Sequence, residues 1–392
     1  MSYDPHSNEW LLNRFDIYKD LRSQDTAYWS EKFQLYVITR YDDVFFALNN
    51  PKIFCSGKGN LLIEDSRRFS KTLGASDNPI HNDYKNIIKN AYSKENIKRI
   101  AKVFQEKAND LFNSSELNVS DITDELSAWV VEEILNLPCD KEVAKNAILE
   151  IHRYDPVLNI DNPGKDLTMH YNILYNAVRK RTPAPGPGVY YEYMNNNPKR
   201  LDSIFLLIAN ILAGPGSLGG ALQSLTLDLY NEKQLDTLLN NRSLIPSAIN
   251  ESLRFRASTG RFCRTVTEDI TIHNVNLKPG DRVALALESA NRDPDKFANP
   301  DQFIITRDSS KHLSWGHGVH ACLAIGLSKE MLNIYLNTML DQIGKYEILT
   351  KPKELQYVFI KGGNIDIMSN IMLDRKSTRL NSSHVALSRM PS

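Results

Sequence analysis

The chain has 392 residues, with 47 basic and 47 acidic side chains and therefore a formal net charge of zero. This balance gives no electrostatic reason to expect a nucleic-acid or anionic-membrane partner for the whole molecule. Hydrophobic residues make up 42% and charged residues 24% of the chain, an ordinary globular composition that argues against a disordered protein. The four cysteines include no CxxC pair, which argues against a disulfide scaffold and a cysteine-rich zinc site.

The start of the chain has no basic segment followed by an apolar one, so no signal peptide is predicted. The longest apolar run, residues 204–214, is too short to span a bilayer. We therefore expect a soluble, cytoplasmic protein with no membrane partner and no nucleic-acid partner.

Apolar residues recur at three- and four-residue spacing along much of the chain, which predicts helices. The predicted helices cover residues 83–91, 96–112, 124–137 and 169–180. Short strands are predicted at 34–39, 262–266, 270–273, 282–287, 356–360 and 364–368, close to Gly-containing turn signals. Residues 182–188 contain three prolines and are predicted to be a loop between two helices. The fold class is therefore mainly α, with one large helical domain and small β-sheets drawn largely from the C-terminal half.

The end of the chain differs in composition from the rest. Residues 375–392 are rich in Ser and Arg and have no sustained apolar period. This segment is predicted to be a disordered tail or sequence foreign to the gene, so the domain is assigned to residues 1–374.

The most informative motif is Trp-Gly-His-Gly-Val-His-Ala-Cys at residues 315–322, directly before a helical pattern. Gly316 and Gly318 allow a tight loop whose backbone can approach a flat group closely. Cys322 stands just before the helix, where backbone N–H groups and the helix dipole favour the thiolate. Such a thiolate can be a nucleophile or a metal ligand, while the plainer alternative is a buried free cysteine.

This motif resembles the haem-binding loop of the cytochrome P450 family, whose pattern is an aromatic residue, Gly, x, Gly, x, His or Arg, x, Cys. Trp315 stands where the family usually has Phe, and Ala324 stands where it often has Gly. The resemblance implies a cytochrome P450 fold and haem b as cofactor, with Cys322 as the axial thiolate on the iron and His320 at a haem propionate. The loop residues implied to bind the haem are Trp315, Gly316, His320, Cys322 and Ala324.

Glu251 and Arg254 are three residues apart and share one face of a predicted helix. Taken alone, such a pair is usually a surface salt bridge of little energetic value. The resemblance instead implies a buried structural pair, and Arg307 matches the position of its third member.

Three further residues match positions that contact the haem edge in the family. His81 and Arg264 are implied to bind the two propionates. Lys85 stands where the family usually has Arg, and it can supply one charge but not a bidentate fork. Together these residues would frame two carboxylates with positive charge.

The central helix carries Ala213-Gly214-Pro215-Gly216-Ser217, where the family usually has a small residue, Gly, x, Asp or Glu, and Thr. The resemblance implies that Ala213 and Gly214 let the helix pass close to the haem and that Ser217 retains the hydroxyl. Gly216 removes the carboxylate, and Pro215 removes a backbone donor and is expected to kink the helix. Either water replaces the carboxylate, or proton supply is altered and peroxide or substrate groups take part.

The resemblance thus implies a haem-thiolate monooxygenase that oxidises a small organic or natural-product-like substrate with O2. Because the chain contains no flavin- or ferredoxin-like segment, electrons would come from a ferredoxin-type partner and its reductase. The protein is expected to be a monomer. Two alternatives stay open because of Gly216: a peroxygenase that uses hydrogen peroxide, and a haem-binding protein without oxygenase activity.

The basic residues near the first haem-edge helix form either a solvated face or a docking surface for an acidic partner. They are Lys85, Lys89, Lys94, Lys98, Arg99 and Lys102. The resemblance also implies that substrate contacts lie in residues 54–64, 155–166, 204–217, 257–260 and 362–364.

Overall fold

The structure is a computed structural model that describes residues 3–24, 27–64, 66–113, 116–154, 166–180, 182–196, 204–343, 346–348, 356–359, 366–369 and 372–375. Its helices are α1 (Asn8–Ser23), α2 (Tyr41–Asn49), α3 (Ile80–Ile88), α4 (Lys94–Leu111), α5 (Val119–Leu135), α6 (Lys141–Tyr154), α7 (Thr168–Arg179), α8 (Val189–Asn196), α9 (Ile204–Asn231), α10 (Leu235–Asn240), α11 (Ile245–Phe255), α12 (Leu287–Ala290) and α13 (Ile325–Ile343). Its strands are β1 (Tyr28–Ser30), β2 (Leu35–Ile38), β3 (Phe54–Cys55), β4 (Glu116–Asn118), β5 (Arg261–Val266), β6 (Ile270–Ile272), β7 (Val275–Leu277), β8 (Arg282–Ala286), β9 (Tyr346–Ile348), β10 (Gln356–Phe359), β11 (Asp366–Ser369) and β12 (Met372–Arg375).

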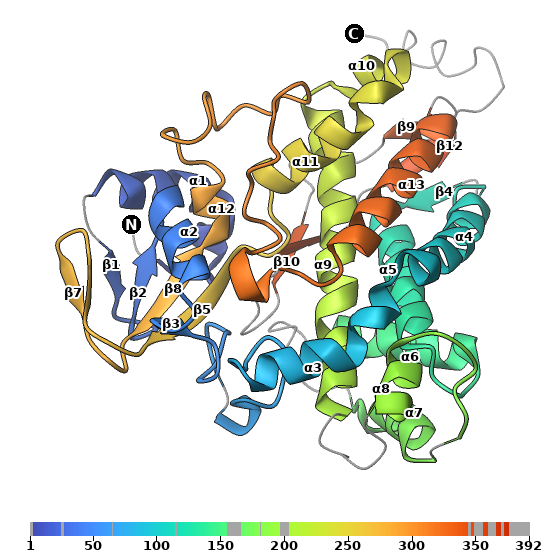
Figure 1. Cartoon of the computed structure of the whole chain (residues 1–392). Coiled ribbons are helices and arrows are strands. Elements are labelled where there is room, and N and C mark those ends of the chain that lie inside the picture. Colours follow the sequence, from blue (N-terminus) through green and yellow to red (C-terminus); the bar gives the residue numbers. More distant parts are fainter. Residues whose placement is uncertain are drawn as a thin grey trace, which may run out of the picture.

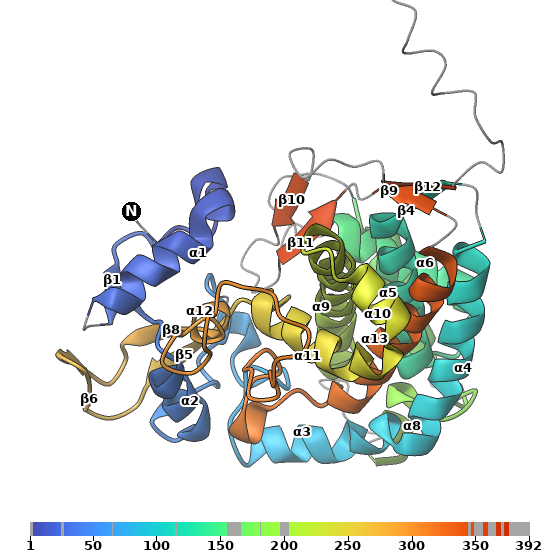
Figure 2. The same ribbon diagram turned by 90° about the horizontal axis from the view of Figure 1, so that it is seen from above.

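The largest sheet lies at one side of the molecule together with α1, α2 and α12, and most of the other helices gather at the opposite side (Figures 1 and 2). Its strand order is β1-β2-β8-β5-β3, in which β2 and β8 are parallel and the other neighbours are antiparallel. The sheet therefore joins strands from the start of the chain to strands more than 200 residues later. Two-stranded β6-β7 and β10-β11 sheets and a β4-β12-β9 sheet complete the β part.

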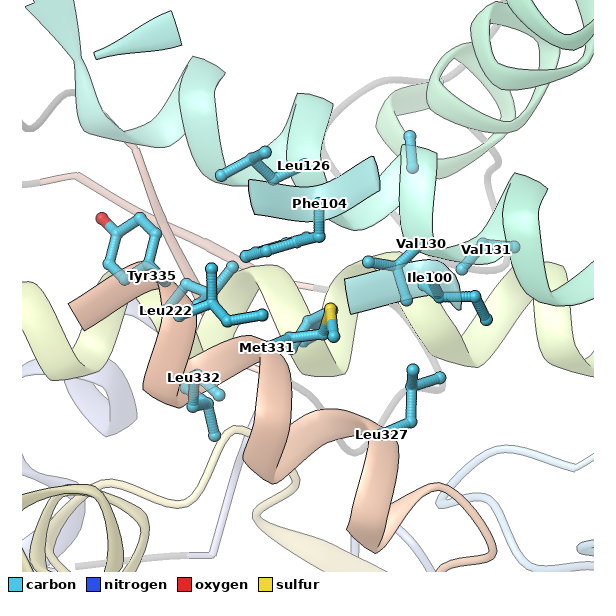
Figure 3. Packing of buried hydrophobic residues seen from close by; sticks show 14 of the residues in the cluster. Ile100, Phe104, Leu126, Val130, Val131, Leu222, Leu327, Met331, Leu332 and Tyr335 are labelled. Atoms are coloured by element: carbon cyan, nitrogen blue, oxygen red, sulfur yellow. The ribbon is translucent and has the colours of Figure 1, made fainter. Parts of the chain in front are cut away.

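Helices α4, α5, α9 and α13 enclose the main hydrophobic core. Figure 3 shows Phe104 of α4, Leu126 of α5, Leu222 of α9 and Met331 of α13 packed against one another. These four side chains are at most 1% exposed. Their burial gives the helical layer its main hydrophobic stabilisation, at roughly 25 cal/mol per Å² of apolar area removed from water.

The expected fold class is confirmed, and the four predicted helices exist with shifted ends as α3, α4, α5 and α7. The Pro-rich residues 182–188 lie in the connection between α7 and α8 and are not helical, as predicted. Strands β1, β3, β4, β7, β9 and β12 were not predicted, because two to four residues are too few to display an alternating pattern. The expectation that the strands come largely from the C-terminal half is only partly met, since β1, β2 and β3 belong to the largest sheet.

Two details at the ends of elements differ from the expectations. Strand β12 pairs Arg375 with Tyr346 of β9, so regular structure extends one residue past the expected boundary at 374. The rest of the expected tail, residues 376–392, lies outside the described residues. Helix α9 contains Pro215 yet is one uninterrupted helix from Ile204 to Asn231 (Figure 1). Within the described residues, no helix is both long and apolar enough to cross a membrane.

Candidate active site

The loop at residues 315–322 is held by its own backbone. The N–H of Cys322 donates to the carbonyl of Trp315 at 2.8 Å, and the N–H of Gly316 donates to the carbonyl of Leu313 at 2.8 Å. Gly316 and Gly318 have φ values of +66° and +67°, a region that favours glycine. A Cβ at Gly318 would lie 2.7 Å from the carbonyl oxygen of Leu48 in α2. The glycine spacing is thus required by both the turn and the close approach of α2.

Cys322 lies three residues before α13, and its thiol is exposed by surface area. Desolvation by the surrounding chain nevertheless raises the pKa of the thiol, whereas a hydrogen bond from the backbone N–H of Ala324 lowers it. The sulfur is thus accessible from outside, although much of its surroundings is protein rather than water. A bound cation or metal would stabilise its thiolate form.

His81 of α3 and His320 of the loop lie against each other, with ring centroids 4.2 Å apart. Both ring nitrogens of His81 lie within hydrogen-bond distance of a carbonyl oxygen, Nδ1 at 2.9 Å from Leu73 and Nε2 at 3.1 Å from Val319. Contact of His81 with a propionate would require one of these carbonyls to be given up. The structure therefore brings the two predicted histidines together, with His81 engaged by the backbone.

Arg264 of β5 is 4% exposed, and within the described residues its guanidinium donates one hydrogen bond, to the carbonyl of Cys263 at 2.7 Å. Burial lowers the pKa of Arg264 to about 10, so the side chain stays charged at neutral pH. Burial also lowers the pKa of His320, and the positive charge of Arg264 lowers it further.

Asp77 also faces this group, although the sequence predicted no role for it. Its Oδ1 lies 3.9 Å from Nε2 of His320. The only sequence signal for it was an acidic residue four positions before His81, which by itself does not distinguish a site residue from a loop residue.

Glu251 and Arg254 of α11 form a buried ion pair, with each side chain 0% exposed. Two guanidinium nitrogens of Arg254 donate to the two carboxylate oxygens at 2.8 and 2.9 Å. Arg307 donates to Oε1 of Glu251 at 3.3 Å, and the N–H of Ile304 and the hydroxyl of Ser309 complete the carboxylate's shell. Although burial raises it, these donors hold the pKa of Glu251 below its usual value. The cluster ties α11 to residues 298–309, the segment that leads into the Cys322 loop.

On α9, the structure shows a contact for Gly214 that differs from the expected one. A Cβ at Gly214 would lie 2.5 Å from Cγ2 of Val131, so its small size is required by packing against α5. Gly216 is buried, and Ser217 is half-buried one residue later. The side chain of Ala213 lies outside the described residues.

The remaining predicted residues are placed as follows. Lys85 is half-buried on α3, one turn after His81. Trp315 packs against the main core, and its Nε1 is buried without a partner in the described part of the chain. Of the basic residues, Lys89, Lys94, Lys98 and Lys102 are exposed, whereas Arg99 turns inward to bind the buried Glu133. Of the expected substrate segments, residues 155–165 and 362–364 lie outside the described residues.

Comparison with known proteins identifies this arrangement. The family model described as "Cytochrome P450" matches residues 233–354, which include the Glu251 cluster and the Cys322 loop. Cytochrome P450-terp from a Pseudomonas species is 25% identical over 373 residues, covering 84% of this chain and 86% of the relative. The chain belongs to the cytochrome P450 family. A biotin biosynthesis cytochrome P450 from Bacillus subtilis is 43% identical over 115 residues, which is 29% of each chain.

Solved cytochromes P450 share the fold of this P450. The structure of P450BioI in complex with an acyl carrier protein ligated to hexadec-9Z-enoic acid has a TM-score of 0.80 at 22% identity, over 94% of this chain and 100% of that one. The structure of CalO2 has a TM-score of 0.82 at 18% identity, over 96% and 99%.

Members of this family bind haem through a cysteine thiolate and act as monooxygenases on small substrates, and so does this P450. The residues of the site fit a haem. Cys322 offers an accessible sulfur beside a glycine-rich loop, and Arg264 offers a buried cation for a propionate.

Proposed function

We propose that this P450 inserts oxygen from O2 into a small organic, natural-product-like substrate in the cytoplasm, as a monomer supplied by a ferredoxin-type protein and its reductase. The observation that carries the proposal is the loop at residues 315–322, in which two positive-φ glycines and two backbone hydrogen bonds present Cys322 before α13. When bound, the haem supplies the redox centre that activates O2, and thiolate ligation favours O–O cleavage.

In this proposal the chain's own residues hold the cofactor and the substrate. Cys322 is the iron ligand, Arg264 and Lys85 supply positive charge near the propionates, and His320 and His81 supply ring nitrogens there. Burial keeps water away from Arg264, so its attraction to a carboxylate is stronger than on the surface. Trp315, Gly316 and Ala324 shape the loop around the haem, and Ser217 provides a hydroxyl on the oxygen-binding side. Glu251, Arg254 and Arg307 support the loop from behind.

For the redox partner, the proposal uses the exposed lysines of α4 and the segment before it. Lys94, Lys98 and Lys102 recur every four residues and share one face of α4. An acidic ferredoxin would be attracted to this face, so its association should weaken as salt increases. Charge reversal at Lys98 should slow reduction by ferredoxin but leave reduction by dithionite unchanged.

The ligand assignment is tested by spectroscopy. The purified protein should bind one haem b per chain, and its ferrous–CO complex should show the strongly red-shifted Soret band of thiolate ligation. Cys322→His should abolish that band while leaving the protein folded. A matched control is Cys139→Ser, which replaces a free cysteine that packs against the main core outside the loop. An unchanged spectrum in Cys322→His would overturn the assignment.

A peroxygenase is the second candidate, and the buried Gly216 favours it because no carboxylate stands beside Ser217. Turnover of a compound panel with ferredoxin, its reductase and NADPH should be compared with turnover driven by hydrogen peroxide alone. The panel should also be run with Gly216→Asp. If Gly216 marks weakened proton delivery, the new acid should raise product per electron and lower peroxide release. Product from peroxide alone, with no gain from the new acid, would favour the peroxygenase. Haem binding without turnover by either route would favour the binding protein.

A further inference from the structure

Residues 56–77, of which residue 65 lies outside the described residues, belong to a loop whose two ends meet at one carboxylate. Asp77 accepts hydrogen bonds from the backbone N–H of Ser56 at 2.9 Å and of Gly57 at 2.8 Å, one on each carboxylate oxygen. Hydrogen bonds to an ionised acceptor are about twice as strong as neutral ones. The carbonyl of Asn60 accepts a further bond at 3.0 Å from the N–H of Cys263, which attaches the loop to β5. Asp77 therefore closes the loop at its base.

The approach of this carboxylate depends on a missing side chain. A Cβ at Gly57 would lie 2.7 Å from Oδ2 of Asp77 and 3.3 Å from the hydroxyl oxygen of Ser70. Residue 57 does not have a positive φ, so the backbone itself would tolerate alanine. Glycine at this position is therefore explained by the room that the carboxylate needs.

The same carboxylate faces the Cys322 loop. Oδ1 of Asp77 lies 3.9 Å from Nε2 of His320, which is an electrostatic contact rather than a hydrogen bond. The side chains of Asp77 and His320 are 32% and 10% exposed, so the contact between them is only partly open to water. Although burial raises the pKa of Asp77, its attraction to His320 and the two backbone N–H groups hold that pKa below the usual value.

A second connection runs parallel to the first. The carbonyl of Asp77 accepts a hydrogen bond from the N–H of His81 at 2.9 Å. The ring of His81 in turn contacts the carbonyl of Val319, next to His320. The position of Asp77 is thus linked to the Cys322 loop through its side chain and through its backbone.

We propose that Asp77 is a positioning residue that couples closure of the 56–77 loop to the orientation of His320, and through His320 to retention of the haem. This inference rests on the proposed role of His320 at a propionate. Asp77 itself does not bind the haem. Residues 54–64 are an expected substrate segment, so the coupling would connect that segment to the cofactor through Asp77 and His320.

The test uses Asp77→Asn in the full-length, haem-loaded protein. Asparagine keeps the size of the side chain but loses the charge and replaces one acceptor with a donor. Amide hydrogen exchange should therefore accelerate in two peptides, one containing Ser56 and Gly57 and one covering residues 317–322. Haem transfer to excess apomyoglobin should become at least tenfold faster. The matched control is Asp83→Asn, which removes one negative charge from an exposed position on α3 and should change neither measurement.

A double variant separates positioning from general destabilisation. If Asp77 acts through His320, adding Asp77→Asn to His320→Asn should cause no further increase in haem release. Additive effects of the two substitutions would overturn the proposal. It would also be overturned if Asp77→Asn accelerated exchange at residues 56–57 while haem release stayed at the wild-type rate.

If Asp77→Asn does not fold, Gly57→Ala tests the same contact from the opposite side, because the new methyl group displaces the carboxylate. It should produce the same pair of changes. Failure of the proposed function gives a different result from failure of this inference. A ferrous–CO complex without the thiolate band would contradict the role of Cys322, whereas the exchange measurements would still report whether the two loops are coupled.

Discussion

Two buried glutamates of this P450 have opposite environments, and their pKa values are shifted in opposite directions. Glu251 of α11 accepts hydrogen bonds from two arginines, a backbone N–H and a hydroxyl, and its pKa lies below the usual value despite burial. Glu132 of α5 is 1% exposed, and neither of its carboxylate oxygens has a hydrogen-bond partner among the described residues. Its nearest cation is Lys141, at 3.7 Å. Burial raises the pKa of Glu132 to about 7.

The difference shows where charge is retained in this fold. Behind the Cys322 loop, a set of donors keeps the carboxylate of Glu251 ionised and joins α11 to residues 304–309. In the helical layer, the neighbouring Glu133 takes both Arg99 and Lys141 as partners, which leaves Glu132 to be protonated instead. A buried carboxylate without donors is more stable as the neutral acid.

The largest loss of stability is expected from Glu251→Ala, which removes the carboxylate that accepts hydrogen bonds from both Arg254 and Arg307. Arg254 would then be a buried cation without its carboxylate, and its remaining bonds are to the backbone carbonyls of Asn291, Pro300 and Gln302. Breaking such a pair costs about 3–5 kcal/mol. We expect little folded, haem-loaded protein, measured by thermal unfolding and by haem content per chain.

A comparison with Glu268→Ala serves as the control for this prediction, because Glu268 is exposed and lies after β5. That variant should unfold within about 0.5 kcal/mol of the wild type, as surface substitutions usually do. A well-expressed, haem-replete Glu251→Ala protein would show that the cluster does not support the loop.

The second prediction reverses the sign of the effect, since Glu132→Gln should stabilise the protein at neutral and higher pH. The pKa of Glu132 is raised from 4.5 to about 7 by folding, so the folded state binds the proton more tightly. The stability that protonated Glu132 contributes is therefore fully present below pH 4.5 and is lost as pH rises through 7. At 1.36 kcal/mol per pKa unit, the variant should gain up to about 3 kcal/mol by pH 8.

Chemical denaturation of both proteins between pH 5 and 8 measures this difference. The gain should be below about 1 kcal/mol at pH 5 and should increase with pH. Glu133→Gln is the matched control, because it removes the carboxylate that Arg99 and Lys141 contact and should destabilise the protein instead. If Glu132→Gln gave no pH-dependent gain, Glu132 would be ionised and paired with Lys141.

The contrast between these glutamates also marks the limit of prediction from sequence. The Glu251–Arg254 spacing and the Gly316 and Gly318 positions are local patterns, so the sequence pointed to the turn and to the helix-face pair. The partners of a buried side chain come from distant segments, as Arg99 of α4 does for Glu133 of α5. For this reason Arg99 was predicted to lie on a solvated face or a docking surface, and no role was predicted for Asp77 or Glu132.

The smallest effect concerns the packing beside Glu132, where α5 and α9 meet. Gly214→Ala would bring a methyl group to 2.5 Å from Cγ2 of Val131, whereas Gly219→Ala would meet the hydroxyl oxygen of Ser127 at 3.2 Å. Both substitutions gain helix propensity, worth about 1 kcal/mol relative to glycine. Overpacking of a buried contact costs about 1–3 kcal/mol. Gly214→Ala should therefore be destabilising by about 1 kcal/mol in thermal unfolding, while Gly219→Ala should be close to neutral.

Because Val131 is the clashing partner, Val131→Ala should relieve the strain of Gly214→Ala in the double variant. A Gly214→Ala protein as stable as Gly219→Ala would mean that the glycine is required on the haem side of α9 rather than against α5.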